Sequence, residues 1–435
     1  MVNSMHAYIE KLKNLPGPES IHRKVFANGI TLLTFSNFHT HSVDIVGMLD
    51  VGAAADPKDK LGLAHFVVSM LSRGTQKKDF QTYHDLLESH GASLTFSCGD
   101  LHSWLRGKAL AEDAEMLIAL AAESVRQPAF PSEYVERLRS QLIANLAIRD
   151  EDTAEVASML FDRALFPSHP YGEPADGFVE TIQTITKNDL LSFHSSYFKP
   201  QGMVLAVAGA LESTEISHLV EKYFGEWENP QAADFALPPI PPPPQSIIRK
   251  HRLIEEKSQT DLQIGAFAPP RISKDYLPVY LGNNILGQFG LMGRIGESVR
   301  SKSGLAYHAS SSINSWEEAG TWEFYAGLNP KNLQKVIDLI REEIRRFIEE
   351  PVTDEELSDS KSHLIGRLPL SLESNIGIAN AIITIERFNL GLDYYQHYPS
   401  RIQAITANQI LEASRKYLHP DKLVIASAGE GKNIE

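Results

Sequence analysis

The chain has 435 residues, more than one ordinary hydrophobic core accommodates, so at least two domains are predicted. Its hydrophobic fraction of 43% and charged fraction of 22% are typical of a globular protein, and its net charge of −14 argues against nucleic acid, whose phosphates need a basic face. No apolar run approaches the roughly 18 residues of a membrane-spanning helix, so neither nucleic acid nor membrane is an expected partner.

The first residues and the single cysteine bear on the compartment. Residues 1–18 alternate polar and apolar side chains and lack the apolar core of about 7–15 residues that a signal peptide needs. Cys98 has no second cysteine to pair with, which suits a reducing compartment. We expect a cytoplasmic protein, or a periplasmic one if a signal peptide has been removed from this sequence.

Two strands and a helix are predicted near the start of the chain. Residues 30–35 and 42–50 alternate as antiparallel strands do, and residues 61–71 carry apolar side chains at i, i+3, i+4 and i+7. Further helices are predicted over residues 109–125 and 132–149. Strands grouped beside grouped helices indicate an α+β fold rather than a wound parallel sheet.

A proline-rich segment divides the chain. Residues 238–244 read Pro-Pro-Ile-Pro-Pro-Pro-Pro, which favours extended polyproline II and cannot join a helix or a central strand. We predict four segments in chain order. They are an N-terminal extension over residues 1–19, a first domain over 20–229, a proline-rich linker over 230–247 and a second domain over 248–435.

The two domains resemble each other in sequence. Segments 194–209 and 414–429 align at a constant offset of 220 residues, and in each an amphipathic helix ends before a proline and an apolar strand ends at a glycine. The opening strands 43–47 and 260–265 are similar too. We infer a tandem duplication with halves of about 200 residues, each a mostly antiparallel sheet covered by helices.

Several motifs together carry a family resemblance. Residues 62–75 read Gly-Leu-Ala-His-Phe-Val-Val-Ser-Met-Leu-Ser-Arg-Gly-Thr, residues 169–172 read His-Pro-Tyr-Gly, and residues 303–307 read Ser-Gly-Leu-Ala-Tyr. Together with the proline-rich linker, these motifs resemble the pitrilysin/insulinase family of zinc peptidases. The resemblance covers about residues 20–430. The family includes the mitochondrial processing peptidase subunits and two-domain bacterial enzymes. The resemblance implies that two such domains form half of a clamshell that encloses a chamber.

The zinc motif of that family is degenerate here. The inverted motif His-x-x-Glu-His supplies two zinc ligands and the general base. In this chain it reads His65-Phe-Val-Val68-Ser69, and the position that the resemblance assigns to the third ligand, a glutamate, holds Asn145. A catalytic zinc needs three protein ligands and an open position for water. We therefore predict no metal, no cofactor and no catalytic residue of its own in this chain.

The second domain keeps residues that the resemblance assigns to the substrate. Arg300 and Tyr307 correspond to the pair that contacts substrate across the chamber, where a guanidinium binds peptide carbonyls and a phenol donates to an oxyanion. Gly287, Gly290 and Gly293 stand where the family has a glycine-rich loop that lets a peptide backbone approach. Spacing alone favours a surface arginine and a half-buried tyrosine. For the three glycines, an ordinary flexible turn is the alternative.

These features predict the non-catalytic subunit of a heterodimeric zinc metallopeptidase. It would supply peptide-binding residues in trans, while a homologous partner with an intact motif would supply the zinc and the general base. Two alternatives stay open. A stand-alone pseudoenzyme, as a homodimer for example, would only bind peptides or form a scaffold, and a rebuilt metal site would combine His65 with distant histidines.

Overall fold

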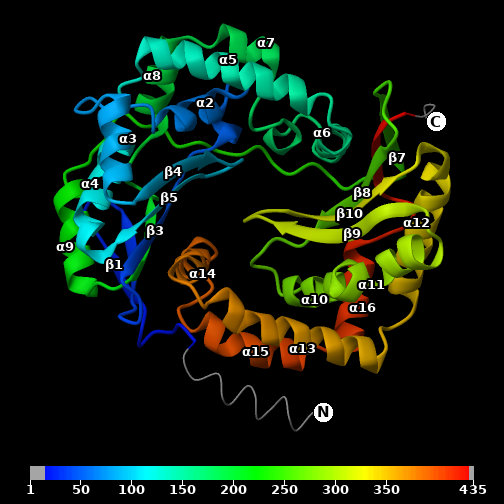
Figure 1. Ribbon diagram of the computed structural model, residues 1–435. Coiled ribbons are helices and arrows are strands. Elements are labelled where there is room, and N and C mark those ends of the chain that lie inside the picture. Colours follow the sequence, from blue (N-terminus) through cyan, green and yellow to red (C-terminus); the bar gives the residue numbers. More distant parts are fainter. Residues whose placement is uncertain (1–14, 431–435) are drawn as a thin grey trace.

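The computed structural model describes residues 15–430, except for the side chains of residues 290–292, and contains two sheets covered by helices (Figure 1). This arrangement confirms the predicted α+β class with two similar halves. Between the halves, the linker contains neither a helix nor a strand from the end of α9 (Ser213–Phe224) to the start of β7 (Ile248–Leu253).

The first half contains a six-stranded sheet. Its strands are β1 (His22–Val25), β2 (Thr31–Ser36), β3 (Ser42–Leu49), β4 (Ser93–Cys98), β5 (Ser103–Leu110) and β6 (Val204–Gly209). Its other helices are α2 (Leu63–Met70), α3 (Phe80–Ser89), α4 (Ala114–Arg126), α5 (Ser132–Arg149), α6 (Thr153–Leu165), α7 (Val179–Thr184) and α8 (Lys187–Tyr197), with 3-10 turns η1 (Ala53–Ala55), η2 (Ala111–Asp113) and η3 (Pro170–Gly172). The helix predicted over 109–125 begins later, because residues 109–110 still pair with β3.

The second half contains a five-stranded sheet. Its remaining strands are β8 (Thr260–Ala268), β9 (Ala306–Ser315), β10 (Gly320–Leu328) and β11 (Val424–Gly429). Its helices are α10 (Tyr276–Gly287), α11 (Phe289–Gly296), α12 (Leu333–Glu349), α13 (Asp354–Ser371), α14 (Asn375–Arg387), α15 (Tyr394–Ala404) and α16 (Ala407–Tyr417), with a π-helical turn η4 (Glu297–Lys302) and a 3-10 turn η5 (Pro330–Asn332).

The strand order supports the inferred duplication. The first sheet runs β1-β2-β6-β3-β5-β4 and the second runs β7-β11-β8-β10-β9. Apart from the extra β1, the two orders are the same, and in each sheet only the pair formed by the first and last strands of the repeat is parallel. Strand β6 recurs as β11 at the predicted offset of 220 residues, and helices α5 and α6 recur as α13 and α14.

Each sheet is covered on one face by a helix from the other half. Helix α14, the orange helix beside the blue strands in Figure 1, packs on β2, β3 and β6, while α6 packs on β7, β8 and β11. Ile378, Ile382 and Ile383 of α14 form one buried cluster with residues such as Val46 and Ala206 of the first sheet. The repeated helices are therefore exchanged between the halves.

The equivalent contact of α6 depends on a glycine. Phe161 is fully buried against the second sheet, and its ring lies over Gly265 of β8. A Cβ atom added at Gly265 would come within 2.9 Å of that ring. The missing side chain thus makes the room that the exchanged helix fills.

Polar contacts fix both ends of α14. At its first residue, Asn375 accepts a hydrogen bond from Asn37 Nδ2 (2.8 Å) and donates one to the carbonyl of Ser42 (3.1 Å). Near its last turn, Glu386 accepts two hydrogen bonds from Arg23 (2.8 and 2.7 Å). These contacts set the position of the helix along the strands, while the isoleucines provide the apolar burial.

The described residues contain no single helix that is long and apolar enough to cross a membrane. Only α13 and α14 taken together reach the required length and composition, and they bend by 113° at the break between them.

Replacing Ile382 by alanine should destabilise the protein by about 2–5 kcal/mol, because a fully buried side chain would leave a cavity between α14 and the first sheet. The decrease in the free energy of unfolding is measured by urea denaturation, monitored by circular dichroism. The matched control is Ile148→Ala on α5, whose side chain is 70% exposed and should change the free energy of unfolding by less than about 0.5 kcal/mol. Equal effects of the two substitutions would contradict the exchanged-helix interface.

Candidate functional site

Helix α2 begins at a half-buried carboxylate. The side chain of Asp56 accepts hydrogen bonds from the backbone N–H groups of Gly62 (2.7 Å) and Ala64 (2.8 Å), so it satisfies donors that the first turn leaves free. Burial raises the pKa of Asp56 to about 7, although these backbone N–H groups act in the opposite direction. Gly62 has a φ of 91°, and a Cβ there would collide with the carbonyl of Asp176.

The residues at the predicted zinc-site positions differ in exposure. His65 and Ser69 are half-buried on α2, four residues apart and therefore on one helical face. Val68, at the position of the general base, is 1% exposed and belongs to the core of the first half. Asn145 is exposed on α5, the helix that packs beside α2. A carboxylate at position 68 would therefore have to enter an apolar core.

The carboxylate whose charge acts on His65 is paired with an arginine. Burial lowers the pKa of His65, against the smaller opposing effect of Asp176, so the imidazole is neutral near pH 7. Arg149, one turn beyond Asn145, donates hydrogen bonds to Asp176 Oδ1 (2.5 Å) and to the carbonyl of Gly177 (2.9 Å). Arg149 also pairs with Asp150 (3.0 Å), so one guanidinium is shared by two carboxylates and the Asp176 oxygen that it contacts is already engaged within the chain.

In the part of the chain that the structure describes, no group of three or more His, Cys, Asp or Glu side chains could hold a metal ion. The chemistry at the motif positions agrees with that result. Ser69 offers a hydroxyl and Asn145 an uncharged amide, neither of which suits zinc as imidazole or carboxylate does. The residues present do not fit a catalytic zinc.

The second half presents Arg300 and Tyr307 to solvent. Arg300 lies in the turn η4, and Tyr307 is the second residue of the edge strand β9 and is 64% exposed. Between them the chain reverses at Gly304, whose φ is 61° and whose N–H donates to the carbonyl of Arg300 (2.9 Å). Within residues 15–430, neither side chain makes a hydrogen bond or an ion pair, so both are available to a ligand.

The predicted glycine-rich loop is helical instead. Gly287 ends α10, while Gly290 and Gly293 lie in α11, and only Gln288 separates the two helices. A Cβ at Gly287 would lie 2.1 Å from Ser311 Oγ, and one at Gly293 would lie 2.5 Å from the carbonyl of Ile285. Two of the glycines therefore allow the helices to pack closely on the second half itself, and the prediction of a loop was wrong.

The His-Pro-Tyr-Gly motif, residues 169–172, contacts the linker through a hydrogen bond. His169 is 3% exposed, its Nδ1 accepts from the N–H of Tyr171 (3.2 Å), and its Nε2 therefore carries the proton and donates to the carbonyl of Pro238 (3.1 Å). Tyr171 stacks on Trp316 of the second half, with ring centroids 4.8 Å apart. In this structure the motif joins the halves.

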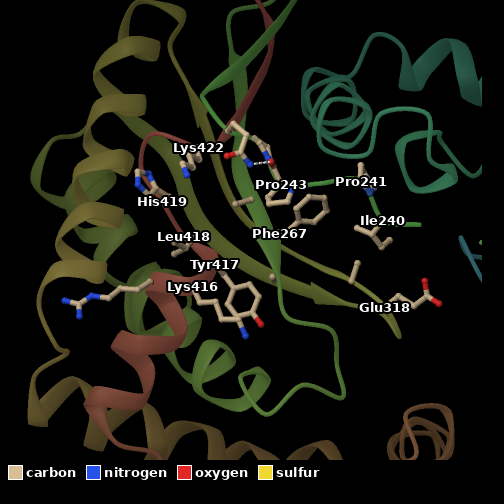
Figure 2. A pocket seen from close by; sticks show the side chains of 16 residues that line it. Ile240, Pro241, Pro243, Phe267, Glu318, Lys416, Tyr417, Leu418, His419 and Lys422 are labelled. Carbon is tan, nitrogen blue, oxygen red and sulfur yellow. Dashed lines mark hydrogen bonds between the residues drawn. The ribbon is translucent and has the colours of Figure 1, made fainter. Parts of the chain in front are cut away.

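The linker also forms one wall of a pocket of about 470 Å³ against the second sheet (Figure 2). Pro241 and Phe267 contribute apolar walls. Three cations line the pocket. Lys416 donates to Asp275 (2.6 Å) and Arg415 donates to main-chain carbonyls, whereas Lys422 has no side-chain hydrogen bond or ion pair in the described structure. The pocket therefore combines apolar walls with one lysine that lacks an acceptor.

An ionic network that was not predicted from the sequence joins the two halves. His102, which precedes β5, lies 3.5 Å from Asp50 Oδ1 and 3.3 Å from Glu317 Oε1 in the β9–β10 turn. Arg387 at the end of α14 donates twice to Glu317 (2.6 and 3.1 Å). Burial acts to raise the pKa of Glu317, but His102 and Arg387 outweigh it and hold the pKa at about 2. No local sequence pattern connects these distant positions.

Fold and site together define a two-domain, peptidase-like chain with a degenerate metal site. The insulinase profile of peptidase family M16 matches residues 32–175, and the profile of the peptidase M16 inactive domain matches residues 184–364. The chain belongs to peptidase family M16, as the resemblance predicted.

Curated relatives include uncharacterized zinc proteases of low sequence identity. One from Mycobacterium leprae is 25% identical over 91% of this chain and 89% of its own length. Another, YmxG from Bacillus subtilis, is 24% identical over 81% of this chain and 85% of its own length.

Solved structures match over almost the whole chain. A peptidase M16 inactive domain from Pseudomonas fluorescens superposes with a TM-score of 0.88 at 25% identity, covering 95% of this chain and 99% of the other. A protease from Helicobacter pylori gives a TM-score of 0.86 at 18% identity, covering 95% of this chain and all of the other, and supports the fold alone.

The purified chain should hold much less than one zinc ion per molecule, because only His65 of the family's ligand set is present. The double variant Ser69→His with Asn145→Glu should gain zinc, since it supplies three ligands. Elemental analysis after dialysis measures the zinc content of the wild-type chain and of the double variant. Each single substitution serves as a control with two ligands and should bind weakly. Stoichiometric zinc on the wild-type chain would instead support a rebuilt metal site.

Glu317→Gln should lower the midpoint of thermal unfolding by a few degrees at pH 5–6, where both His102 and Glu317 are charged. The folded pKa of about 2 lies below the unfolded value of about 4.3, so the stabilisation from Glu317 is present above pH 4.3 and is lost as pH falls towards 2. Although burial acts to lower the pKa of His102, Asp50 and Glu317 raise it. The contribution of His102 to folding stability is therefore lost as pH rises through that raised pKa.

The matched control is Glu318→Gln, which changes an exposed neighbour that forms no ion pair in the described structure. A difference between wild type and Glu317→Gln that stayed constant from pH 2 to pH 6 would exclude the ionic network as its cause.

Proposed function

We propose that this chain is the non-catalytic subunit of a heterodimeric zinc metallopeptidase that acts on peptides or unfolded segments. Its second half would present Arg300 and Tyr307 to the substrate, while a homologous subunit with an intact His-x-x-Glu-His motif would supply zinc, the activated water and the general base. Two features support this role: the first half has residues that do not fit a catalytic zinc, and the second half has the arginine and tyrosine that the family resemblance assigns to substrate.

The exposure of Arg300 and Tyr307 is the observation that carries this proposal. Long charged and aromatic side chains that stabilise a fold are usually packed or paired, whereas these two are exposed and have no internal hydrogen bond or ion pair in the described structure. Tyr307 also lies on an edge strand, which another chain can approach. Both groups are therefore free to contact a peptide held between two subunits.

The chemistry of the pair suits a role in trans. The guanidinium of Arg300 offers donors in a fixed geometry to peptide carbonyls, which orients the substrate. The phenol of Tyr307 can donate to the oxyanion that develops when a zinc-bound water attacks the scissile carbonyl. Neither role requires a metal in this chain. The positioned water and the proton acceptor would belong to the partner.

Titrating this chain into its zinc-bearing homologue from the same source tests the proposal directly. Hydrolysis of a quenched fluorescent peptide should rise with added chain and saturate near equimolar ratio. Tyr307→Phe should lower kcat of the mixture about 10²–10³-fold, because it removes one donor to the oxyanion. Arg300→Ala should also lower kcat/KM, and size-exclusion chromatography should show assembly intact for both variants.

Lys302→Ala is the matched control, since Lys302 is an exposed cation in the same turn as Arg300 and pairs with Glu297 (3.0 Å). It should leave turnover near the wild-type level. If the homologue alone cleaves peptides as fast as the mixture, the split active site is wrong. If the variants do not affect a complex that does form, the chain acts as a scaffold.

A further inference from the structure

A second pocket, separate from Arg300 and Tyr307, lies among α10, α13 and α15 below the second sheet in Figure 1. Its volume is about 290 Å³, room for about ten water molecules at ~30 Å³ each. Five tyrosines, two arginines, three leucines and one serine line it, and no aspartate or glutamate does. The lining therefore carries two cations and no carboxylate, although the net charge of the protein is −14.

Arg271 is held in this pocket by aromatic rings rather than by an acid. Its guanidinium carbon lies 4.1 Å from the centroid of the Tyr276 ring and 5.3 Å from that of Tyr394. Nη2 donates a hydrogen bond to the Tyr394 hydroxyl (2.9 Å), and no carboxylate in residues 15–430 pairs with this side chain. Ring contacts hold the cation in place but leave its charge without a counter-ion.

Arg367 supplies the second positive charge. It is exposed on α13, and in the described structure its side chain has no ion pair or hydrogen bond. Tyrosine hydroxyls add uncharged donors, because burial raises the pKa of Tyr276 to about 12 and shifts that of Tyr398 upward as well. These phenols therefore remain protonated at neutral pH. The pocket combines two guanidinium groups, phenolic donors and flat aromatic walls.

We propose that this tyrosine–arginine pocket binds a small organic anion, a phosphate monoester or a carboxylate, that carries one aromatic or apolar group. The oxyanion would lie between Arg271 and Arg367, where planar guanidinium groups match its oxygens. The apolar group would contact the tyrosine rings and leucines such as Leu277 and Leu364. The volume admits a single ring with its charged group, and excludes a folded protein segment.

The position of the pocket links binding to the joint between the halves. Tyr394 lines the pocket and also belongs to the buried cluster formed by α14 and the first sheet. Helices α13 and α15 directly precede and follow α14 in the chain. A ligand that bridges the walls of this pocket would stabilise the segment from which α14 extends, and would raise the midpoint of thermal unfolding.

Binding can be measured on the whole purified chain by isothermal titration calorimetry with phenyl phosphate, benzoate, inorganic phosphate and, as an uncharged probe, benzyl alcohol. Phenyl phosphate or benzoate should bind and raise the unfolding midpoint, whereas benzyl alcohol should do neither. Comparing phenyl phosphate with benzoate tells which oxyanion the pocket prefers. Tighter binding of phenyl phosphate than of inorganic phosphate would show that the aromatic walls contribute.

Arg367→Ala should weaken binding about tenfold or more, because it removes a charged hydrogen-bond donor from an exposed position without disturbing the core. Arg137→Ala is the matched control, since Arg137 is also an exposed helical arginine without an ion pair in the described structure. Tyr398→Phe keeps the aromatic ring and removes one hydroxyl, so it tests the contribution of that hydroxyl to binding separately from that of the ring. Absence of binding by both organic anions, or equal affinities of wild type and Arg367→Ala, would overturn the proposal, and neither result depends on peptidase activity.

Discussion

The exchange of helices α6 and α14 between the two halves is the constraint on which the rest of this structure depends. A sheet that is apolar on both faces must be covered on both, and each half supplies only one cover from its own helices. The opposite face is filled by a helix of the other half, with Ile382 on one side and Phe161 on the other as fully buried examples. Neither half can then expose that face without losing a large apolar contact, so the β4–β5 and β9–β10 hairpins are held in a fixed relation. The ionic contacts of Glu317 with His102 and Arg387 form at that junction because the exchange brings the two turns together.

The same rigidity explains how the first half keeps its fold with Ser69 and Asn145 at the family's metal-ligand positions. Zinc in a catalytic site positions water and substrate, but here α2 is held by core packing and by the Asp56 contacts at its first turn. Val68 adds to that packing, and Arg149 neutralises Asp176 within the chain. Contacts within the protein therefore hold α2 in its place in the described structure. Arg300 and Tyr307 add nothing comparable to the core, since both are exposed. Both side chains are therefore accessible to a ligand, and neither contributes to the buried core of the second half.

Sequence reasoning succeeded where information is local or repeated. The 220-residue offset predicted two similar halves, and the periodicity of residues 132–149 gave α5 with its observed bounds. It failed at Gly287 and Gly293, because glycine allows both a flexible loop and close helix packing, and only the neighbouring Ser311 and Ile285 decide between them. It also missed the exchange of α6 and α14: an apolar helical face is visible in the sequence, but nothing in it states which sheet that face covers. The His102–Glu317 contact joins residues 215 positions apart and was invisible for the same reason.

The tyrosine–arginine pocket follows from the duplication in a further way. Helix α13 repeats α5, and α14 repeats α6, yet the two copies have different surroundings. In the first half the end of α5 carries Arg149, whose charge is neutralised by Asp176. In the second half the last turns of α13 carry Arg367, which has no such acid in the described structure and faces a pocket lined by tyrosines. Arg271 and Arg367 both line this pocket, and neither pairs with a carboxylate in the described structure. Duplicated helices thus place an arginine near the same helical end in both halves, internally paired in one and open to a ligand in the other.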